Sequence, residues 1–224
     1  MKVLMLSKDA SILRSGSEAR ERMLALSSIV ERLHVVALTT REKKNDRPLG
    51  TSRIRISRHL VIHPTNSATK FSSLSDALRI GQELLPMKES RGSKDWLVTA
   101  QDPFETGFVG WLLTMRRRAA LELQVHTDVE SQFFRKESFS NMLRLYMARF
   151  LLPRAKGVRA VSNRVAVSIS SMISRRPAIL PVFVDVALLR ASPPKIELHK
   201  KFPQFDFLVL AVSFNKLSIG VCWA

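Results

Sequence analysis

The residues with the most chemistry available to them follow a short, partly alternating apolar stretch in the middle of the chain. His126 and Asp128 come directly after residues 121–125, and Glu130 is close behind. A histidine placed there can donate a hydrogen bond to a ligand hydroxyl or stabilise a developing charge, and a nearby carboxylate can act as a general base. The competing interpretation is a strand-end histidine whose ring is hydrogen-bonded by neighbouring backbone groups.

Two more groups of residues have the types and positions expected of a ligand site. Gly16 and Ser17 follow the first apolar stretch, where a glycine allows backbone to approach a ligand and helix N–H groups favour phosphate. Asp102 and Glu105 follow a later apolar stretch and add two carboxylates. Structural interpretations stay open for both groups, because Gly16 also fits an ordinary turn and the two acids also fit the start of a helix.

A fourth group consists of Ser162 and Arg164, which follow residues 157–161. Ser162 fits a helix cap better than a nucleophile, because the chain shows no Ser-His-Asp pattern with a nucleophile elbow. His59 and His63 are four residues apart, but they lie in a basic segment and show no ligand spacing with His126. The sequence therefore predicts no metal site.

These groups need a scaffold, and the hydrophobic pattern predicts one. Short apolar stretches typical of buried strands alternate with stretches in which apolar residues recur every three or four positions, as in helices. The predicted strands are residues 3–6, 35–39, 53–57, 96–100, 121–125, 157–161 and 179–184. The predicted helices are residues 16–33 (opened by a capping box of Ser15 and Glu18), 74–85, 103–118, 139–152 and 162–173.

Such alternation predicts an α/β fold, specifically a Rossmann-like three-layer α/β/α domain with a mostly parallel sheet. Right-handed crossovers then place the carboxyl end of every parallel strand at one rim of the sheet. All four groups of candidate residues fall at this rim, which is where open α/β sheets bind their ligands. The sequence therefore predicts a cleft at that rim.

The domain organisation changes near the C-terminus. We expect the Rossmann-like domain to occupy residues 1–190 and a linker to occupy residues 191–204, because Ser192, Pro193 and Pro194 break the pattern. Residues 205–224 begin with an apolar strand, as at the start of a second domain, followed by a tail too short to build one. We expect a C-terminally truncated or frame-shifted product, or one half of a split enzyme.

The composition favours an anionic partner in a reducing compartment. The chain has 224 residues, is 46% hydrophobic and carries a formal charge of +17, so it can bury a full core and also attract nucleic acid, acidic lipid or a phosphorylated substrate. The single cysteine, Cys222, excludes an internal disulfide framework. The apolar run at the N-terminus is too short for a signal peptide, so we expect a cytoplasmic protein.

A basic segment surrounds the predicted helix 139–152. We expect Arg135, Lys136, Arg144 and Arg149 to face an anionic membrane, because arginines beside bulky apolar groups suit such a surface. That arrangement would make the protein peripheral at the inner face of the cell membrane. The alternative is a helix that packs its apolar face on the core and leaves its charges in water.

Five stretches, taken in this order, resemble the N-terminal half of a family 4 glycosyltransferase, a retaining nucleotide-sugar enzyme of GT-B architecture. They are MKVLMLSKDASILRSGSEARERMLAL, AQDPFETGFVG, QVHTDVESQFF, RFLLPRAKGVRAVSNRV and ILPVFVDV. The last differs from the family's usual Pro-Asn-Gly-Val-Asp form, although Pro181, Val184 and Asp185 keep their places. The resemblance spans residues 1–212.

The resemblance implies two Rossmann-like domains facing each other across a cleft, with a glycan or lipid-linked acceptor held mainly by the N-terminal one. It places Gly16 near the diphosphate and acceptor, and gives His126 the catalytic position facing the donor sugar. The donor substrate is a nucleotide sugar, and no separate cofactor is implied.

The chain departs from the family after residue 212, where FNKLSIGVCWA replaces the expected continuation and the donor-binding carboxylate motif is absent. We therefore expect little or no transferase activity from this chain by itself, with a partner chain as one possible source of the donor domain. The alternative function is a non-catalytic basic α/β module that binds nucleic acid or a protein. No nucleic-acid-binding motif supports that alternative, so nucleic acid is not the expected partner.

Overall fold

The computed structural model describes residues 1–41, 53–87, 96–117, 119–181, 186–191, 197–205 and 207. The chain divides into two compact units, Met1–Val182 and Phe183–Ala224. The described helices of the second unit are α7 (Val186–Ala191) and α8 (Leu198–Lys201). Among the described residues, no helix is both long and apolar enough to cross a membrane.

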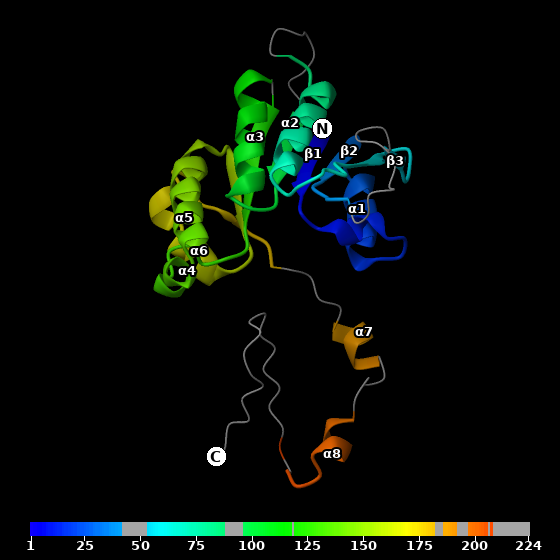
Figure 1. The fold of residues 1–224 in the computed structure, drawn as a ribbon, viewed down its shortest axis with the longest axis vertical. Coiled ribbons are helices and arrows are strands. Elements are labelled where there is room, and N and C mark those ends of the chain that lie inside the picture. Colours follow the sequence, from blue (N-terminus) through cyan, green and yellow to red (C-terminus); the bar gives the residue numbers. More distant parts are fainter. Residues whose placement is uncertain are drawn as a thin grey trace. The chain divides into compact units, whose positions relative to one another are not determined.

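The first unit is built on one sheet with the strand order β3-β4-β2-β1-β5-β6-β7-β8, of which Figure 1 labels β1, β2 and β3. The strands are β1 (Lys2–Ser7), β2 (Arg32–Ala37), β3 (Ile54–Arg55), β4 (Leu60–Pro64), β5 (Trp96–Ala100), β6 (Ala119–Val125), β7 (Gly157–Ala160) and β8 (Ala178–Ile179). All neighbours are parallel except β3 and β4. The chain builds outward from β1 in one direction and then from β5 in the other, so the switch point lies between β1 and β5.

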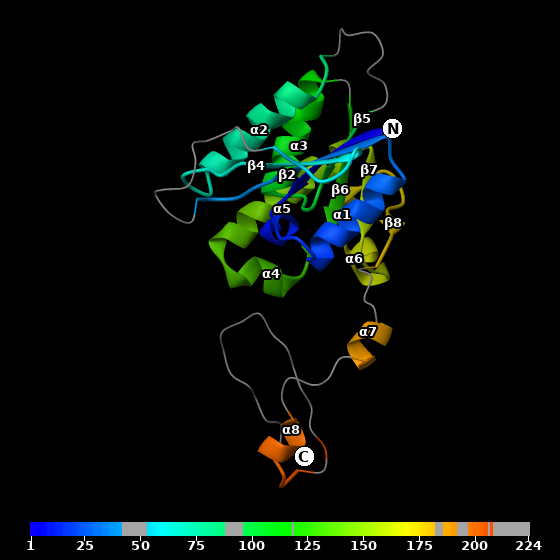
Figure 2. The same cartoon turned by 90° about the vertical axis from the view of Figure 1, so that its right-hand side faces the viewer.

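Helices cover both faces of this sheet. They are α1 (Glu18–Ser28), α2 (Ser72–Leu84), α3 (Glu105–Arg116), α4 (Gln132–Glu137), α5 (Phe139–Leu151) and α6 (Asn163–Ser168). Because side chains alternate along a strand, Leu4 and Leu6 pack with residues of α2, α3 and α5, whereas Val3 and Met5 pack with residues of α1. Figure 2 shows α1 on the opposite side of the strands from α2 and α3. The expected Rossmann-like three-layer α/β/α domain with a mostly parallel sheet is confirmed.

Glycines bring α3 close to the sheet. A Cβ atom at Gly107 would lie 2.7 Å from the backbone oxygen of Asp102 and 3.1 Å from a methyl group of Leu123. A Cβ atom at Gly110 would lie 3.0 Å from a methyl group of Leu121. The first turn of α3 is therefore fixed tightly against β6 and against the loop that leaves β5.

The prediction for the first helix was wrong at both ends. Ser17, not Ser15, is its N-cap, since the Ser17 hydroxyl accepts a hydrogen bond from Arg20 N at 3.2 Å. The helix ends at Ser28 because Leu33 belongs to β2, where it is fully buried. Leu33 lies three residues after Val30 and seven after Leu26, so it also fits a helical repeat, and this explains why the predicted helix was too long.

The edge of the sheet near β3 also differs from the prediction. Residues 60–64 were not expected to form a strand, yet β4 pairs with both β2 and β3, and β3 is antiparallel. The helix α3 begins at Glu105, so Pro103 lies in the preceding turn rather than at the first helical position. The helix α4 was not predicted.

Several expectations lie outside the described residues. They include most of the polar loop 41–51, residues 182–184 of the last predicted strand, and nearly all of the strand that begins at residue 205. The domain boundaries at residues 190 and 204 stay a prediction.

Candidate functional site

The ends of β1 and β5 meet at the switch point of the sheet, where the candidate site begins. Ser7, the last residue of β1, donates a hydrogen bond from its hydroxyl to Gln101 Oε1 at 2.6 Å, which joins the two strand ends. The Ser7 hydroxyl also accepts a hydrogen bond from Asp9 N at 3.0 Å. The residues that follow each strand, Lys8 and Asp102, are thereby held side by side.

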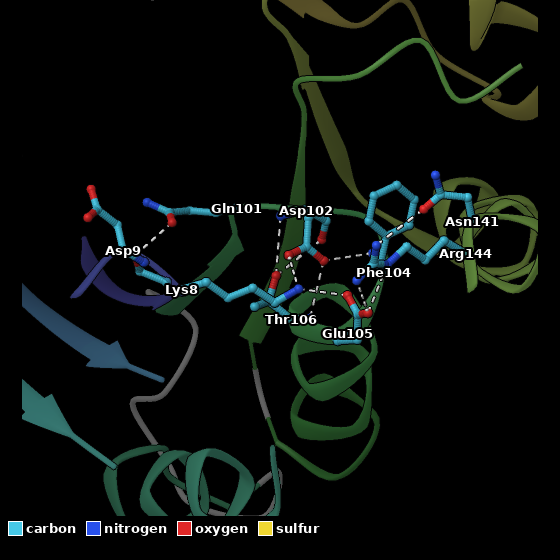
Figure 3. Close-up of polar contacts among 10 residues, drawn as sticks. Lys8, Asp9, Gln101, Asp102, Phe104, Glu105, Thr106, Asn141 and Arg144 are labelled. Carbon is cyan, nitrogen blue, oxygen red and sulfur yellow. Dashed lines mark hydrogen bonds and ion pairs between the residues drawn. The ribbon is translucent and has the colours of Figure 1, made fainter. Parts of the chain in front are cut away.

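Lys8, Asp102, Glu105 and Arg144 form a connected charge network, shown in Figure 3 and referred to below as the rim network. Lys8 Nζ lies 3.0 Å from Asp102 Oδ2 and donates to Glu105 Oε2 at 2.6 Å. Glu105 Oε1 accepts from Arg144 Nε at 2.9 Å and lies 2.8 Å from Arg144 Nη2. One cation directly follows β1 and the other lies on α5, and they pair with one carboxylate in the loop before α3 and one at the first residue of α3.

Asp102 also shapes the loop between β5 and α3. Its Oδ1 atom accepts hydrogen bonds from Phe104 N at 2.9 Å and from Thr106 N at 3.2 Å. The structural interpretation of Asp102 as a group that caps the start of the helix therefore holds, while its other oxygen faces Lys8. One oxygen of Asp102 therefore stabilises the turn before α3, and the other belongs to the ion pair with Lys8.

Arg144, one of the residues expected to face a membrane, has its guanidinium paired with Glu105 of the rim network. It bonds Glu105, donates to Asn141 Oδ1 at 3.3 Å and lies 5.8 Å from the centre of the Phe104 ring. Asn141 in turn donates to Glu137 Oε2 at 2.9 Å. Arg149 is also paired, with Glu130 at 3.0 Å, whereas Arg135 and Lys136 are exposed on α4.

Glu105 stays ionised because its cationic neighbours outweigh its burial. Partial burial by itself raises the pKa of this carboxyl, but hydrogen bonds from Lys8, from its own backbone N–H and from Arg144, together with the Lys8 charge, lower the pKa overall. Glu105 therefore enters the rim network as a carboxylate at neutral pH.

His126 follows β6 at the same rim, and its ring is exposed. Desolvation lowers the pKa of His126 most, the charge of Arg159 lowers it further, and Asp102 opposes both. The imidazole is thus neutral at pH 7, with one donor and one acceptor nitrogen. None of the hydrogen bonds among the described residues uses this ring, so the interpretation of a backbone-satisfied histidine has no support there.

Gly16 and Ser17 lie in the loop that enters α1. Gly16 has a φ of +71°, in the left-handed region that favours glycine, and open space surrounds the position of its missing Cβ. The Ser17 hydroxyl caps α1 and donates to Ser11 O at 2.7 Å. Among the described residues, no direct bond joins Gly16 or Ser17 to the four residues of the rim network.

Asp128, Ser162 and Arg164 form the far part of the rim, between β6 and β7. Asp128 Oδ2 lies 3.6 Å from Arg164 Nε, and the Arg164 side chain is 84% exposed. Asp128 Oδ1 is buried and has no hydrogen-bond partner among the described residues. The Ser162 hydroxyl accepts from Val165 N at 3.2 Å, as the capping interpretation requires.

Two members of the rim escaped the sequence-based search. Lys8 directly follows the first predicted strand, so its place at the rim was available, but no pattern connected it with carboxylates about a hundred residues away. Gln101 was missed for the same reason, since its contact with Ser7 depends on the pairing of β1 with β5. The rim as a whole offers a neutral imidazole and a charge-balanced set of donors and acceptors, which suits a ligand rich in hydroxyl groups.

The comparisons with known proteins bear on the fold. No family model and no curated protein matches the sequence. A solved structure of sucrose-phosphate synthase from Thermosynechococcus elongatus matches 85% of this chain and 95% of that chain, at 15% identity and a TM-score of 0.55. The likeness shows a shared fold. The apo structure of OtsA matches 92% of this chain and 55% of that chain, at 10% identity and a TM-score of 0.48.

Proposed function

We propose that this chain is the acceptor-binding domain of a retaining, nucleotide-sugar-dependent glycosyltransferase of the family 4 type. The observation that carries the proposal is the convergence of Lys8, Asp102 and Glu105 at the switch point of a sheet, with the unbonded ring of His126 at the same rim. A shared fold with a sucrose-phosphate synthase is consistent with it. The acceptor would be a glycan or a lipid-linked saccharide.

In this proposal each group at the rim has a distinct task. The neutral ring of His126 hydrogen-bonds a sugar hydroxyl, and the carboxylates of Asp102 and Asp128 accept hydrogen bonds from others. Gly16 and Ser17 supply the loop next to the diphosphate, while Ser162 and Arg164 bound the far side. Catalysis rests on orientation and on stabilisation of the departing diphosphate, so the transfer requires a donor-binding domain beyond these described residues.

Binding of saccharides tests the acceptor role. Saturation-transfer NMR with mono- and disaccharides should show binding to the purified chain, with His126→Ala weakening it about tenfold through the loss of a hydrogen bond inside the site. The matched control is His199→Ala, which removes an exposed histidine from α8 and should change nothing. Equal binding by all three proteins, or no binding by any saccharide, would contradict the proposal.

Activity of the chain alone tests the other half of the proposal. Purified protein incubated with nucleotide sugars and acceptor saccharides should give no transfer and no hydrolysis above background. Robust turnover of either kind, in the absence of any partner chain, would show that the donor-binding groups are present and would overturn the assignment to acceptor binding.

We further propose that the exposed side of α5 contacts an anionic membrane at the inner face of the cell. The helix buries Leu145, Ala148 and Leu151, yet it also exposes a second apolar stripe. The stripe comprises Phe139, Met142, Leu143, Tyr146 and Phe150, with exposures from 38% to 79%. Their spacing of three and four residues places them on one side of the helix.

Basic groups flank this stripe. Arg135 and Lys136 are exposed on α4, and the Arg154 guanidinium lies 3.8 Å from the centre of the Phe150 ring. Apolar side chains bordered by cations suit the boundary between lipid head groups and acyl chains. The membrane-facing set is thus centred on Phe139 and Tyr146, with Arg144 and Arg149 already engaged by carboxylates.

Vesicle flotation separates this proposal from a solvated helix. The chain should float with anionic vesicles and not with neutral ones, and a Phe139→Ser/Tyr146→Ser variant should lose most of the binding. Phe71→Ser is the matched control, because Phe71 is 87% exposed at the start of α2. Equal flotation with both vesicle types, or an equal loss in the control, would contradict membrane contact.

The alternative of a non-catalytic basic module that binds nucleic acid or a protein is tested by the same protein samples. It predicts binding to duplex DNA or to RNA whose affinity falls steeply with salt, in proportion to the phosphates neutralised. Such binding without any saccharide binding would favour that alternative.

A further inference from the structure

A pocket on the face of the β2-β4-β3 edge gathers four arginines around a pair of histidines. It is lined by Arg32, Arg53, Arg55 and Arg58, which are exposed, and by His34 and His63, which are half-buried. This arginine pocket has a volume of about 110 Å³, and Leu84 of α2 and Val61 of β4 complete its lining. It lies away from the carboxyl ends of the strands that form the rim.

The pairing of three strands explains why these residues meet. His34 is opposite Val61 in the parallel pair of β2 and β4, and Val61 is opposite Arg55 in the antiparallel pair of β4 and β3. Residues two apart on a strand share a face, so Arg32 joins His34 and His63 joins Val61 on the same face. Arg32 comes from β2, Arg55 and Arg53 come from β3 and the residue before it, and Arg58 comes from the turn between β3 and β4.

We propose that the arginine pocket binds the phosphate group of a small soluble ligand. This inference does not rest on the glycosyltransferase function. None of the described residues that line the pocket is acidic, and the ion pairs within the described part of the chain all use other cations. Four guanidinium groups held together without a carboxylate repel one another, and an anion of high charge relieves that repulsion.

The chemistry of arginine and the size of the pocket favour phosphate over other anions. Guanidinium groups present two parallel N–H donors that match two phosphate oxygens, and arginine is preferred where such forked recognition is needed. A volume of about 110 Å³ is below the roughly 300 Å³ at which pockets for whole drug-sized ligands begin. It therefore fits a phosphate or diphosphate group rather than an entire nucleotide.

The two histidines add a hydrogen-bond donor to the pocket. His34 Nδ1 lies 3.0 Å from His63 Nε2, and the rings stack with their centres 5.3 Å apart. Burial first, and then neighbouring positive charge, lowers the pKa of each to about 4, so both rings are neutral at pH 7. Whichever ring donates the shared hydrogen, the accepting ring keeps one N–H that is free for a phosphate oxygen.

A titration followed on the histidine side chains tests the proposal. Pyrophosphate is added to the full chain at pH 7 and constant ionic strength, and the NMR resonances of the five histidines are recorded. We expect saturable shifts of His34 and His63, with His59, His126 and His199 unmoved. The absence of saturable shifts, or uniform shifts of all five, would overturn the proposal.

Variants separate a built site from a general attraction to positive charge. Arg53→Gln/Arg55→Gln should weaken pyrophosphate binding about tenfold or more. Arg175→Gln/Arg176→Gln removes the same two charges from an exposed segment and should leave affinity unchanged. Equal losses in both would overturn the proposal. Arg58→Gln is a second pocket variant, to be used if circular dichroism shows the double variant to be unfolded.

The source of the phosphate is resolved by a second ligand. The same titration is repeated with glycerol 3-phosphate. Tighter binding than that of pyrophosphate indicates that the ligand is a phosphate ester, and weaker binding indicates that it is a free diphosphate. Either order supports the proposal, provided that the pocket variants lose binding. A short DNA strand that shifts His34 and His63 while neither small phosphate does so would overturn it in favour of nucleic acid.

Discussion

The rim network and the arginine pocket both concentrate charge on one sheet, but they differ in how that charge is balanced. At the rim, Lys8 and Arg144 surround Asp102 and Glu105 at distances of 2.6 to 3.0 Å. In the arginine pocket, four guanidinium groups meet no carboxylate among the lining residues. The first region contains its own counter-charges, whereas the described lining of the second supplies none for its arginines.

This difference in charge balance implies different roles for the two clusters. A balanced network fixes loops, as Asp102 does for the turn before α3, and it presents polar groups in set positions to an uncharged ligand. An unbalanced cluster stores repulsion that a ligand releases. The two regions should therefore respond in opposite ways when their charges are removed.

The largest expected loss of stability comes from a substitution that displaces α3 and so disturbs the rim network. Gly107→Ala places a Cβ atom 2.7 Å from the Asp102 carbonyl oxygen, and overpacking of this kind costs about 2 to 3 kcal/mol of unfolding free energy. Gly157→Ala is the control, because its Cβ would lie 3.7 Å from Glu122 Cγ, an ordinary contact. Urea unfolding of both variants measures the difference, and similar losses would contradict the close packing of α3.

The next effect removes one charge from the rim network. Glu105→Gln leaves Lys8 and Arg144 without their shared carboxylate and should cost about 1 to 2 kcal/mol at pH 7. Because the folded-state pKa of Glu105 lies below its ordinary 4.5, this stability is present above pH 4.5 and is lost as the pH falls through the folded pKa.

Unfolding at pH 7 and at pH 3 checks the prediction for Glu105. The wild type and Glu105→Gln should converge in stability at the lower pH. Glu18→Gln is the control, since that carboxylate is 77% exposed and its ion pair with Arg22 is 3.6 Å long. A loss in the control as large as that in Glu105→Gln would contradict a special role for the network.

Acid should weaken the protein through the histidines of the arginine pocket. The pKa of His34 and of His63 is lowered from 6.5 to about 4, so between these values the unfolded chain binds protons that the folded chain does not. Stability therefore falls as the pH drops from about 6.5 to 4, by on the order of 1 kcal/mol after allowance for the partial exposure of both rings.

Thermal unfolding across this pH range measures the histidine effect. His34→Gln/His63→Gln should show a flatter dependence than the wild type, and His59→Gln should retain the wild-type slope, because the His59 ring lies outside the pair and bonds Glu31 O at 2.8 Å. A wild-type slope in the double variant would show that other groups carry the acid sensitivity.

The smallest expected change in stability comes from removing arginines from the pocket, and it separates the pocket from the rim network most clearly. Arg53→Gln/Arg55→Gln should leave stability unchanged within about 0.5 kcal/mol or raise it slightly, because it relieves repulsion. Lys8→Gln should instead lose about 1 kcal/mol, even after allowance for its 43% exposure, because it removes the ion pair of Asp102 and leaves Glu105 paired with Arg144 alone. Chemical denaturation measures both changes in unfolding free energy. Losses of the same sign and size would contradict the difference in charge balance between the two regions.

Much of the fold could be predicted because buried parallel strands and amphipathic helices differ in period. The strands that begin near Val3, Trp96 and Leu121 are apolar runs, and their positions placed Asp102 and His126 at one rim before any contact was known. The N-cap of α1 was misplaced because Ser15 and Ser17 both precede an apolar repeat. Only the hydrogen bond that Arg20 N donates to Ser17 Oγ distinguishes them.

Other features depend on pairing that a local pattern does not encode. The strand β4 has an apolar run of only three residues, Leu60, Val61 and Ile62, before His63 and Pro64, so this short signal was missed, and the contact of His63 with His34 could not be predicted without it. The helix α5 has apolar residues on two sides, and the sequence alone does not say that Leu145 faces the core while Tyr146 faces outward.

One histidine spectrum tests the whole account, because its probes lie in both regions. His126 reports on the rim, and His34 and His63 report on the arginine pocket. We predict that the best-binding saccharide shifts only His126 and that pyrophosphate shifts only His34 and His63. Ligands that move the same set of resonances, or a His126 signal that no saccharide changes, would contradict the assignment of acceptor binding to the rim.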